Sequence, residues 1–197
     1  VIGHLDGICH IYVDEYADKE KAENVVYNSK LRRTGICGAA ETLLMHEKCL
    51  ESHLPSIIKI LKDGGCEIRC DKIINQIYPD LIEAKEIDWN TEYLDSIISI
   101  KVVDNLEQAI KHITKYGSNH TESIITENNV NAELFLNQVG SAIVMHNTST
   151  QFADGGEFGL GAEIGIATGK LHARGPVGLE GLTTYKYKVR GNGQIRP

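Results

Sequence analysis

The chain has 197 residues, of which 42% are hydrophobic and 24% are charged, as in an ordinary globular domain. This composition excludes a disordered tail and a fibrous repeat. Twenty basic residues against 27 acidic ones give a net charge of −7, and the basic residues are scattered along the chain. Nucleic acid is therefore not an expected partner, because binding to a phosphate backbone needs a basic face.

The chain also lacks the features of a membrane or secreted protein. No apolar run approaches the roughly 18–20 residues of a spanning helix, and the first four residues lack the basic and apolar regions of a signal peptide. The absence of an initiating Met indicates a trimmed N-terminus or a start inside a longer chain.

Five cysteines, an odd number, favour reduced thiols and a cytoplasmic location over disulfides. Cys66 and Cys70 have no second pair at zinc-site spacing, so no metal ligands are predicted.

Apolar positions alternate between two periods, which predicts strands interleaved with helices. The chain begins with a strand at 9–13, a helix around 22–29 capped by Asp18, an apolar run at 42–45 and a helix around 50–61 ended by Gly64 and Gly65. A strand at 97–103 and a helix around 106–113 capped by Asp104 follow, and then a strand at 123–126, a helix at 131–138 and a strand at 141–145. The fold class is α/β, an open, mostly parallel sheet with flanking helices.

Beyond Met145 the chain is rich in glycine, and regular structure should thin out. Long irregular segments in a compact domain are usually functional loops. In the tail 182–197, Tyr185, Tyr187 and Val189 alternate with basic residues, as in an edge strand that pairs with a partner.

The glycines do not match a nucleotide-binding motif. Gly159-x-Gly161 is followed by glycine at 165 where the dinucleotide pattern needs it at 164, and Gly169-Lys170 fails the P-loop pattern. A loop that faces a substrate or cofactor and a plain glycine turn both remain open.

The segment Arg32-Arg33-Thr34-Gly35-Ile36-Cys37-Gly38-Ala39-Ala40 carries the most chemical information. A cysteine between small residues, in a loop between a helix and a strand, can present its sulfur to a cleft. The two arginines would favour the thiolate and attract an anionic substrate. The alternative is a buried small thiol beside solvated arginines.

Four blocks together resemble γ-glutamyl phosphate reductase, a family of the aldehyde dehydrogenase superfamily. They are His4-Leu-Asp-Gly-Ile-Cys-His-Ile-Tyr-Val-Asp, Arg33-Thr-Gly-Ile-Cys-Gly-Ala-Ala-Glu-Thr-Leu-Leu, Asp154-Gly-Gly-Glu-Phe-Gly-Leu-Gly-Ala-Glu and Leu171-His-Ala-Arg-Gly-Pro-Val-Gly-Leu-Glu-Gly-Leu-Thr-Thr-Tyr-Lys. The resemblance implies an oxidoreductase of proline biosynthesis. This family reduces L-glutamyl 5-phosphate with NADPH to L-glutamate 5-semialdehyde and phosphate, through a thioester on the residue that matches Cys37.

The resemblance also suggests further site residues. His4 takes the place of a water-activating glutamate in hydrolytic aldehyde dehydrogenases, and we expect it to face the substrate. Glu92, Phe158 and Gly159 are expected to contact the cofactor. Arg32, Arg33 and Arg174 are candidates for binding the phosphate or the substrate carboxylate.

The resemblance divides the chain into a catalytic domain at 3–181 and an oligomerisation tail at 182–197, and a homo-oligomer formed through the tail strand is expected. Complete family members are about twice as long, and their N-terminal cofactor-binding domain has no counterpart here. Two alternatives stay open. One is a non-catalytic, self-associating remnant, and the other is a cysteine hydrolase that pairs Cys37 with His4 or His172.

Overall fold

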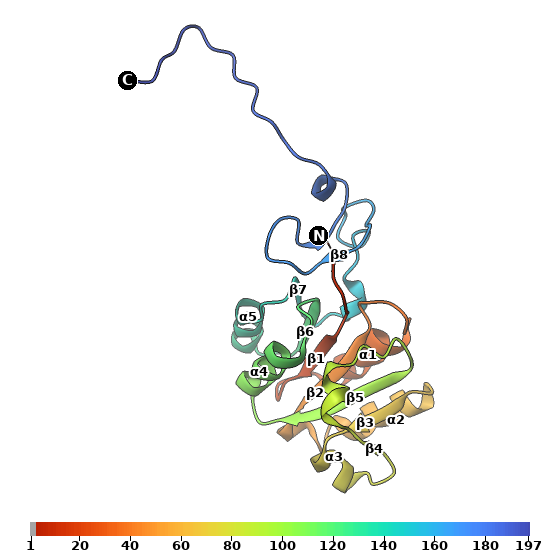
Figure 1. The fold of residues 1–197 in the computed structure, drawn as a ribbon. Helices are drawn as coiled ribbons and strands as arrows, with labels where there is room; N and C mark the ends of the chain where they lie inside the picture. The colour runs from red at the N-terminus through yellow and green to blue at the C-terminus, as the bar shows by residue number, and fades with distance from the viewer. Residues whose placement is uncertain (1–2) are drawn as a thin grey trace.

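The computed structural model describes residues 3–197. Its main body is a seven-stranded sheet in which every pairing is parallel, with the strand order β4-β3-β5-β2-β1-β6-β7 (Figure 1). The strands are β1 (Cys9–Val13), β2 (Ala40–His46), β3 (Glu67–Cys70), β4 (Ile82–Glu83), β5 (Ile97–Val103), β6 (Thr121–Ile125) and β7 (Ile143–His146). The predicted α/β class and parallel sheet are confirmed.

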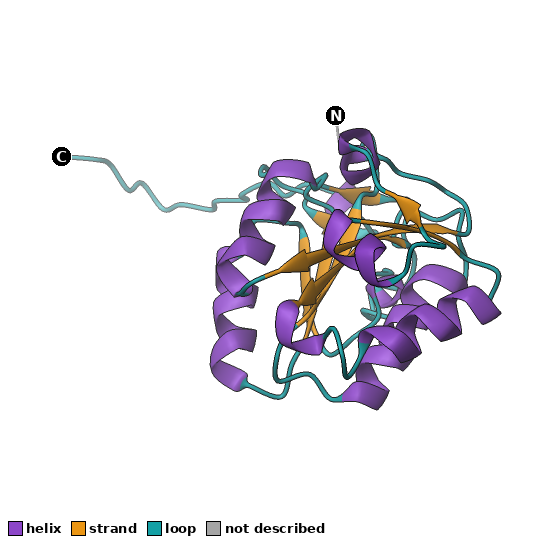
Figure 2. Cartoon of the chain, turned by 90° about the horizontal axis from the view of Figure 1, so that it is seen from below, coloured by secondary structure: helices purple, strands orange, loops and turns teal. Residues whose placement is uncertain are grey.

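Helices cover both faces of the sheet, as Figure 2 shows from below. They are α1 (Lys19–Leu31), α2 (Leu54–Asp63), α3 (Lys72–Ile77), α4 (Leu106–Tyr116) and α5 (Asn129–Gln138). One core joins the sheet to α1, α2 and α3 through residues such as Val26, Ile57 and Ile74. The other joins it to α4 and α5 through Ile113 and Phe135. Helices on both faces explain why β1, β2 and β6 are buried along their whole length, without the alternation of a half-exposed strand.

The helix boundaries follow local capping. Asp18 accepts a hydrogen bond from the amide of Lys21, which confirms it as the N-cap of α1, and α2 ends at Gly64. The expected cap of α4 was wrong by one position. Asn105 accepts from the amide of Gln108 and is the N-cap, whereas Asp104 lies outside the helix and accepts from the Gln108 side chain.

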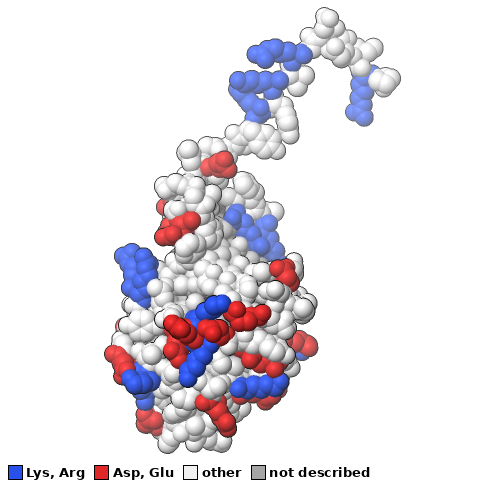
Figure 3. Space-filling view, turned by 180° about the vertical axis from the view of Figure 1, so that it is seen from behind, with Lys and Arg blue, Asp and Glu red and all other residues white. Residues whose placement is uncertain are grey.

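After β7 the chain forms loops, short 3-10 turns and a two-stranded antiparallel sheet of β8 (Ile166–Ala167) and β9 (Gly175–Pro176). The N-terminal segment lies against this small sheet, since the amide of Thr168 donates to Gly3 O at 3.3 Å. In Figure 1 the chain then runs away from the body as an extended tail. Acidic and basic side chains are interspersed over the body in Figure 3, and the tail carries mainly basic groups.

The tail strand expected over 182–189 has no partner strand within residues 3–197, so its pairing with a second chain stays a prediction. Leu182 ends a 3-10 turn, and residues 183–190 have no strand partner among residues 3–197. Tyr185, Tyr187 and Val189 are 79%, 84% and 88% exposed. A strand needs a hydrogen-bonded neighbour, and the described part of the chain supplies none beside the tail.

Candidate functional site

Three loops meet at the amino-terminal edge of the sheet. Gly7 precedes β1, Cys37 precedes β2 and His120 precedes β6, and β1 lies between β2 and β6. In parallel strands the entering loops lie at the same edge, so residues far apart in sequence are brought together there. The register pairs Cys9 with Ala40 and His10 with Glu122, which aligns the three loops.

The backbone at Cys37 is held tightly by the loop before β1. A Cβ placed on Gly7 would lie 2.2 Å from Cys37 O and 2.6 Å from Cys37 Cα, so only glycine allows this approach. The thiol of Cys9 donates to Cys37 O at 3.1 Å. The block that contains Gly7 therefore positions the block that contains Cys37.

Cys37 lines a pocket of about 330 Å³ that contains both signs of charge. Arg32 and Arg33, which were predicted to bind the substrate, lie on its wall, and so do Asp154, Glu157 and Glu163 from the glycine-rich segment. Two of these carboxylates also shape that segment. Asp154 Oδ1 accepts from the amide of Gly156 at 2.7 Å, and Glu163 Oε2 accepts from the amide of Gly155 at 2.8 Å.

Burial and two nearby carboxylates reverse the expected effect on the pKa of the cysteine. Burial raises the pKa of the Cys37 thiol, and the carboxylates of Glu163 and Glu92 raise it further, while the backbone amides of Cys37 and Gly38 lower it. The expectation that the two arginines favour the thiolate is wrong for this chain. Both arginines are exposed, where solvent screens their charge, and Arg32 Nη1 is 3.5 Å from Gln151 Oε1.

Two histidines lie beside the sulfur. One ring nitrogen of His4, one of His120 and the Cys37 Sγ all lie within 4.8 Å of one another. The rings of His4 and His120 meet edge to face, with centroids 4.7 Å apart. His4 Nδ1 is 2.8 Å from Ile166 O, so it donates to that carbonyl and leaves Nε2 with the lone pair.

Glu92 reaches the same edge of the sheet. Its Oε1 accepts from the Gly7 amide at 2.9 Å, so the carboxylate is held against the loop that packs on Cys37. The side chain is half-buried, and no hydrogen bond joins its second oxygen to another residue of the described chain 3–197.

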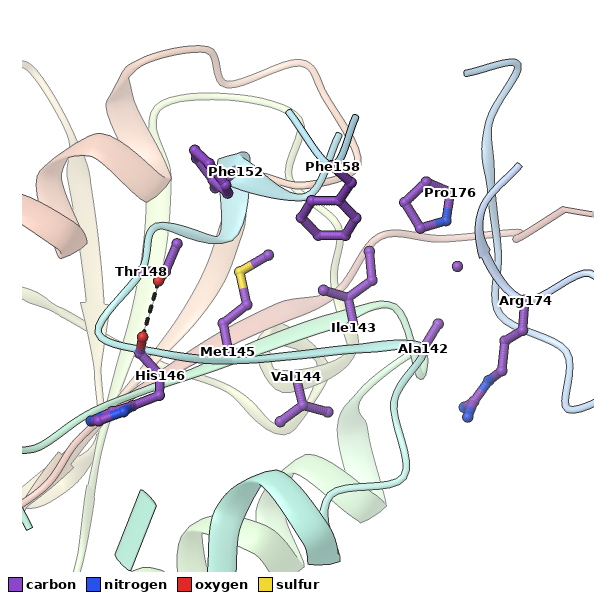
Figure 4. A pocket seen from close by; sticks show the side chains of 11 residues that line it. Ala142, Ile143, Val144, Met145, His146, Thr148, Phe152, Phe158, Arg174 and Pro176 are labelled. Carbon is purple, nitrogen blue, oxygen red and sulfur yellow. Dashed lines mark hydrogen bonds between the residues drawn. The ribbon is translucent and has the colours of Figure 1, made fainter. Parts of the chain in front are cut away.

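The remaining predicted site residues lie outside the Cys37 pocket. Phe158 and Arg174 line a neighbouring pocket of about 450 Å³, in which Phe158 and Phe152 lie above Met145 and Ile143 (Figure 4). Gly159 borders a third pocket, with Arg174.

Figure 4 draws the Arg174 side chain toward one end of its pocket, and its guanidinium donates to Gly140 O. The structure does not bring Arg174 to the cysteine.

Sequence reasoning did not find His120, Asp154 or Glu163. His120 stands alone before β6, and no motif marks it. Asp154 and Glu163 were recognised only as the two ends of a glycine-rich block. An acidic residue at each end of that block was the available signal that this loop carries negative charge to the site it faces.

All five cysteines are free, as expected. No helix within residues 3–197 has the length and apolar character that crossing a membrane requires.

Comparisons with known proteins agree with the fold. No model of a protein family matches the chain. It is 60% identical over 197 residues to γ-glutamyl phosphate reductase of Parvibaculum lavamentivorans, covering all of this chain and 46% of that protein. The crystal structure of γ-glutamyl phosphate reductase from Thermotoga maritima is 52% identical, with a TM-score of 0.97, over 100% of this chain and 48% of that one.

The resemblance to γ-glutamyl phosphate reductase is confirmed. The yeast γ-glutamyl phosphate reductase from Saccharomyces cerevisiae is also similar, at 32% identity and a TM-score of 0.63, over 98% of this chain and 43% of that one. An acetylating aldehyde dehydrogenase from Geobacillus thermoglucosidasius shares the fold at 17% identity and a TM-score of 0.71, over 98% of this chain and 53% of that one. The chain spans about half the length of the γ-glutamyl phosphate reductases it matches.

Proposed function

We propose that this chain carries the catalytic cysteine of an NADPH-dependent reductase that converts L-glutamyl 5-phosphate to L-glutamate 5-semialdehyde and phosphate in proline biosynthesis. The observation that supports this most strongly is the placement of Cys37. Its backbone is clamped by Gly7 and its sulfur faces a charged pocket, in a chain similar along its full length to γ-glutamyl phosphate reductases.

The sulfur chemistry follows from the nature of the substrate. The Cys37 thiolate attacks the acyl carbon, the carbon–oxygen bond to phosphate breaks, and a thioester forms. When bound, the nicotinamide supplies the hydride that reduces this thioester. Collapse of the resulting thiohemiacetal on Cys37 breaks the carbon–sulfur bond and releases the aldehyde and the thiolate. Cysteine suits both steps because its sulfur is a good nucleophile and a good leaving group.

The thiol needs a proton acceptor, because burial and two carboxylates raise its pKa. The Nε2 lone pair of His4 is suited to take that proton, since Nδ1 donates to Ile166 O. The same position holds no carboxylate that would activate water against the thioester.

The pocket charges match the charges of the substrate. Glutamyl phosphate carries a phosphate and a carboxylate, which suit Arg32 and Arg33, and an ammonium group, which suits Asp154 or Glu157. Arg174 lies in the neighbouring pocket, so we do not assign it to the substrate in this chain.

For the cofactor, Glu92 fits best among the predicted residues. One of its carboxylate oxygens is fixed by the Gly7 amide, which leaves the other to accept a hydrogen bond from a ribose hydroxyl. Phe158 offers an apolar surface beside Phe152, with ring centroids 6.4 Å apart. We assign the main NADPH-binding domain to the part of γ-glutamyl phosphate reductase that this chain does not span. The division into a catalytic domain at 3–181 and a tail at 182–197 stays a prediction.

We further propose a cytoplasmic homo-oligomer. The free thiols favour a reducing compartment. The extended tail exposes apolar side chains and unpaired backbone groups that an edge of a second copy could pair. Light-scattering mass measurement of the chain and of a version ending at residue 182 tests this. A larger assembly only with the tail supports it, and equal monomers contradict it.

The test of the reductase joins this chain to the remaining part of the Parvibaculum relative. The chimera should oxidise NADPH when given L-glutamyl 5-phosphate, and Cys37→Ser should abolish the oxidation. No oxidation by a folded chimera would favour the non-catalytic remnant. Nucleotide-independent ester hydrolysis that requires Cys37 and His4 would favour the cysteine hydrolase.

A further inference from the structure

Cys37, His4 and His120 together have the composition of a transition-metal site. Their candidate ligand atoms, one sulfur and two ring nitrogens, all lie within 4.8 Å of one another. Within residues 3–197 no other group of three or more Cys, His, Asp or Glu side chains is arranged so closely. Cys66 and Cys70 in particular lack a third ligand in the described chain.

His120 is the most informative member of this cluster. It is fully buried, and its Nε2 has no hydrogen-bond partner among the described residues. Its Nδ1 lies 2.9 Å from Thr121 Oγ1 and 3.5 Å from Cys9 Sγ. The Cys9 proton is used on Cys37 O, so Cys9 Sγ and Thr121 Oγ1 can accept from Nδ1–H. Nε2 then carries a lone pair that none of the described residues uses.

His4 has the same arrangement. Its Nδ1 donates to Ile166 O at 2.8 Å, which fixes the tautomer and leaves Nε2 free. A metal-binding histidine usually donates one ring N–H to a carbonyl or carboxylate and binds the metal through its other nitrogen.

We propose that Cys37, His4 and His120 bind a zinc ion, which holds the cysteine as a metal-bound thiolate and blocks it as a nucleophile. One thiolate and two imidazoles are ligands that Zn²⁺ favours, and three protein ligands leave one of its four positions open. At bond lengths of about 2.3 Å to sulfur and about 2.0–2.1 Å to nitrogen, the ligand atoms would be about 3.3–3.6 Å apart. The ligand atoms now lie up to 4.8 Å apart, and movement of the half-buried His4 and Cys37 side chains would bring them to these separations.

Binding exchanges one proton for the metal. The Cys37 thiol proton leaves to solvent as the sulfur–zinc bond forms, and no electron is transferred. Zinc binding does not depend on the proposed function, whereas inhibition by zinc rests on the proposed role of Cys37 as the nucleophile.

The test measures binding on the 197-residue chain, with no catalytic assay. Zinc affinity is measured by competition with a chromophoric chelator, and cobalt(II) is used as a spectroscopic substitute. The chain should bind one zinc ion, and its cobalt form should show sulfur-to-cobalt charge-transfer absorption. Cys37→Ser should remove that absorption. Cys37→Ser and His4→Ala should each lower zinc affinity by more than about 100-fold, since loss of an outer-shell partner alone commonly costs about 10–100-fold.

The matched controls are Cys66→Ser and His172→Ala, which change a thiol and an exposed ring outside the cluster and should leave the affinity unchanged. No binding, or equal affinity in wild type, Cys37→Ser and His4→Ala, overturns the proposal. Because His4 is half-buried, its variant should fold even where a His120 variant fails to. Zinc binding by a chain whose chimera does not oxidise NADPH would refute the proposed function and leave this inference standing. An active chimera without zinc binding would support the proposed function and refute this inference.

Discussion

Substituting Gly7 with alanine tests how closely the two N-terminal blocks depend on each other. The new Cβ would lie 2.2 Å from Cys37 O, 2.6 Å from Cys37 Cα and 2.8 Å from Cys37 C. An ordinary carbon contact begins at 3.4 Å, so the two segments must separate by about 1.2 Å at the closest pair. The clashing atoms are all backbone, and no flexible side chain can move aside.

The expected effect is therefore on both stability and chemistry. Overpacking of this kind costs about 1–3 kcal/mol of the free energy of unfolding. A displacement of about 1 Å at a reacting group can cost about 100-fold in rate. We expect Gly7→Ala to lose this much kcat/KM in the active chimera, and to change the alkylation rate of Cys37 in the 197-residue chain.

Urea unfolding gives the stability, and peptide mass spectrometry gives the alkylation rate of each cysteine. Gly35→Ala is the control, because its Cβ would meet nothing within 4 Å and its backbone is not left-handed. The reasoning is refuted if Gly7→Ala matches wild type in stability, alkylation and kcat/KM.

Three further predictions concern charge and packing. Glu163→Gln should lower the pKa of Cys37 and speed its alkylation at pH 7, because it removes a carboxylate that raises that pKa, and an unchanged pH profile would contradict this. Phe135→Ala should lower the free energy of unfolding by about 3–5 kcal/mol, because the ring is fully buried. A loss below about 1 kcal/mol in a urea titration would contradict this packing of the ring. Lys30→Met should lower the free energy of unfolding by about 3–5 kcal/mol, because it leaves the buried carboxylate of Glu41 unpaired. Lys21→Met removes an exposed ion pair with Glu127 and should lower it by less than about 1 kcal/mol. Equal losses for the two variants in a urea titration would refute this contrast.

The sequence predicted the elements whose pattern is strong. The strand at 97–103 is dense in β-branched residues, and the helix before Gly64 has an apolar stripe, so local preference and tertiary packing agree there. It did not predict β3, α3 and β4, which are short and carry charged residues. Their place at one edge of the sheet depends on pairing with β5, and a local pattern cannot reveal that pairing.

The candidate site was predictable only in part. Small residues around Cys37 predicted a loop that presents this residue to a cleft, and Cys37 does line a pocket, but its close contact with the backbone of Gly7 was not predicted. His120 was not predictable, because its position beside Cys37 depends on β6 pairing with β1. The rise in the pKa of Cys37 was missed for a similar reason. Glu163 reaches the sulfur through loop packing, whereas the arginines are near it in sequence but exposed to solvent.

The central claim is that Cys37 accepts the glutamyl group of an acyl phosphate. The most direct measurement supplies L-glutamyl 5-phosphate to the chimera without NADPH, and locates any added glutamyl group by peptide mass spectrometry. The account predicts one hydroxylamine-labile glutamyl group on Cys37, with equimolar phosphate released and none in Cys37→Ser. A folded chimera that binds NADPH yet carries no acyl group on Cys37, or carries it equally on another cysteine, would contradict the account.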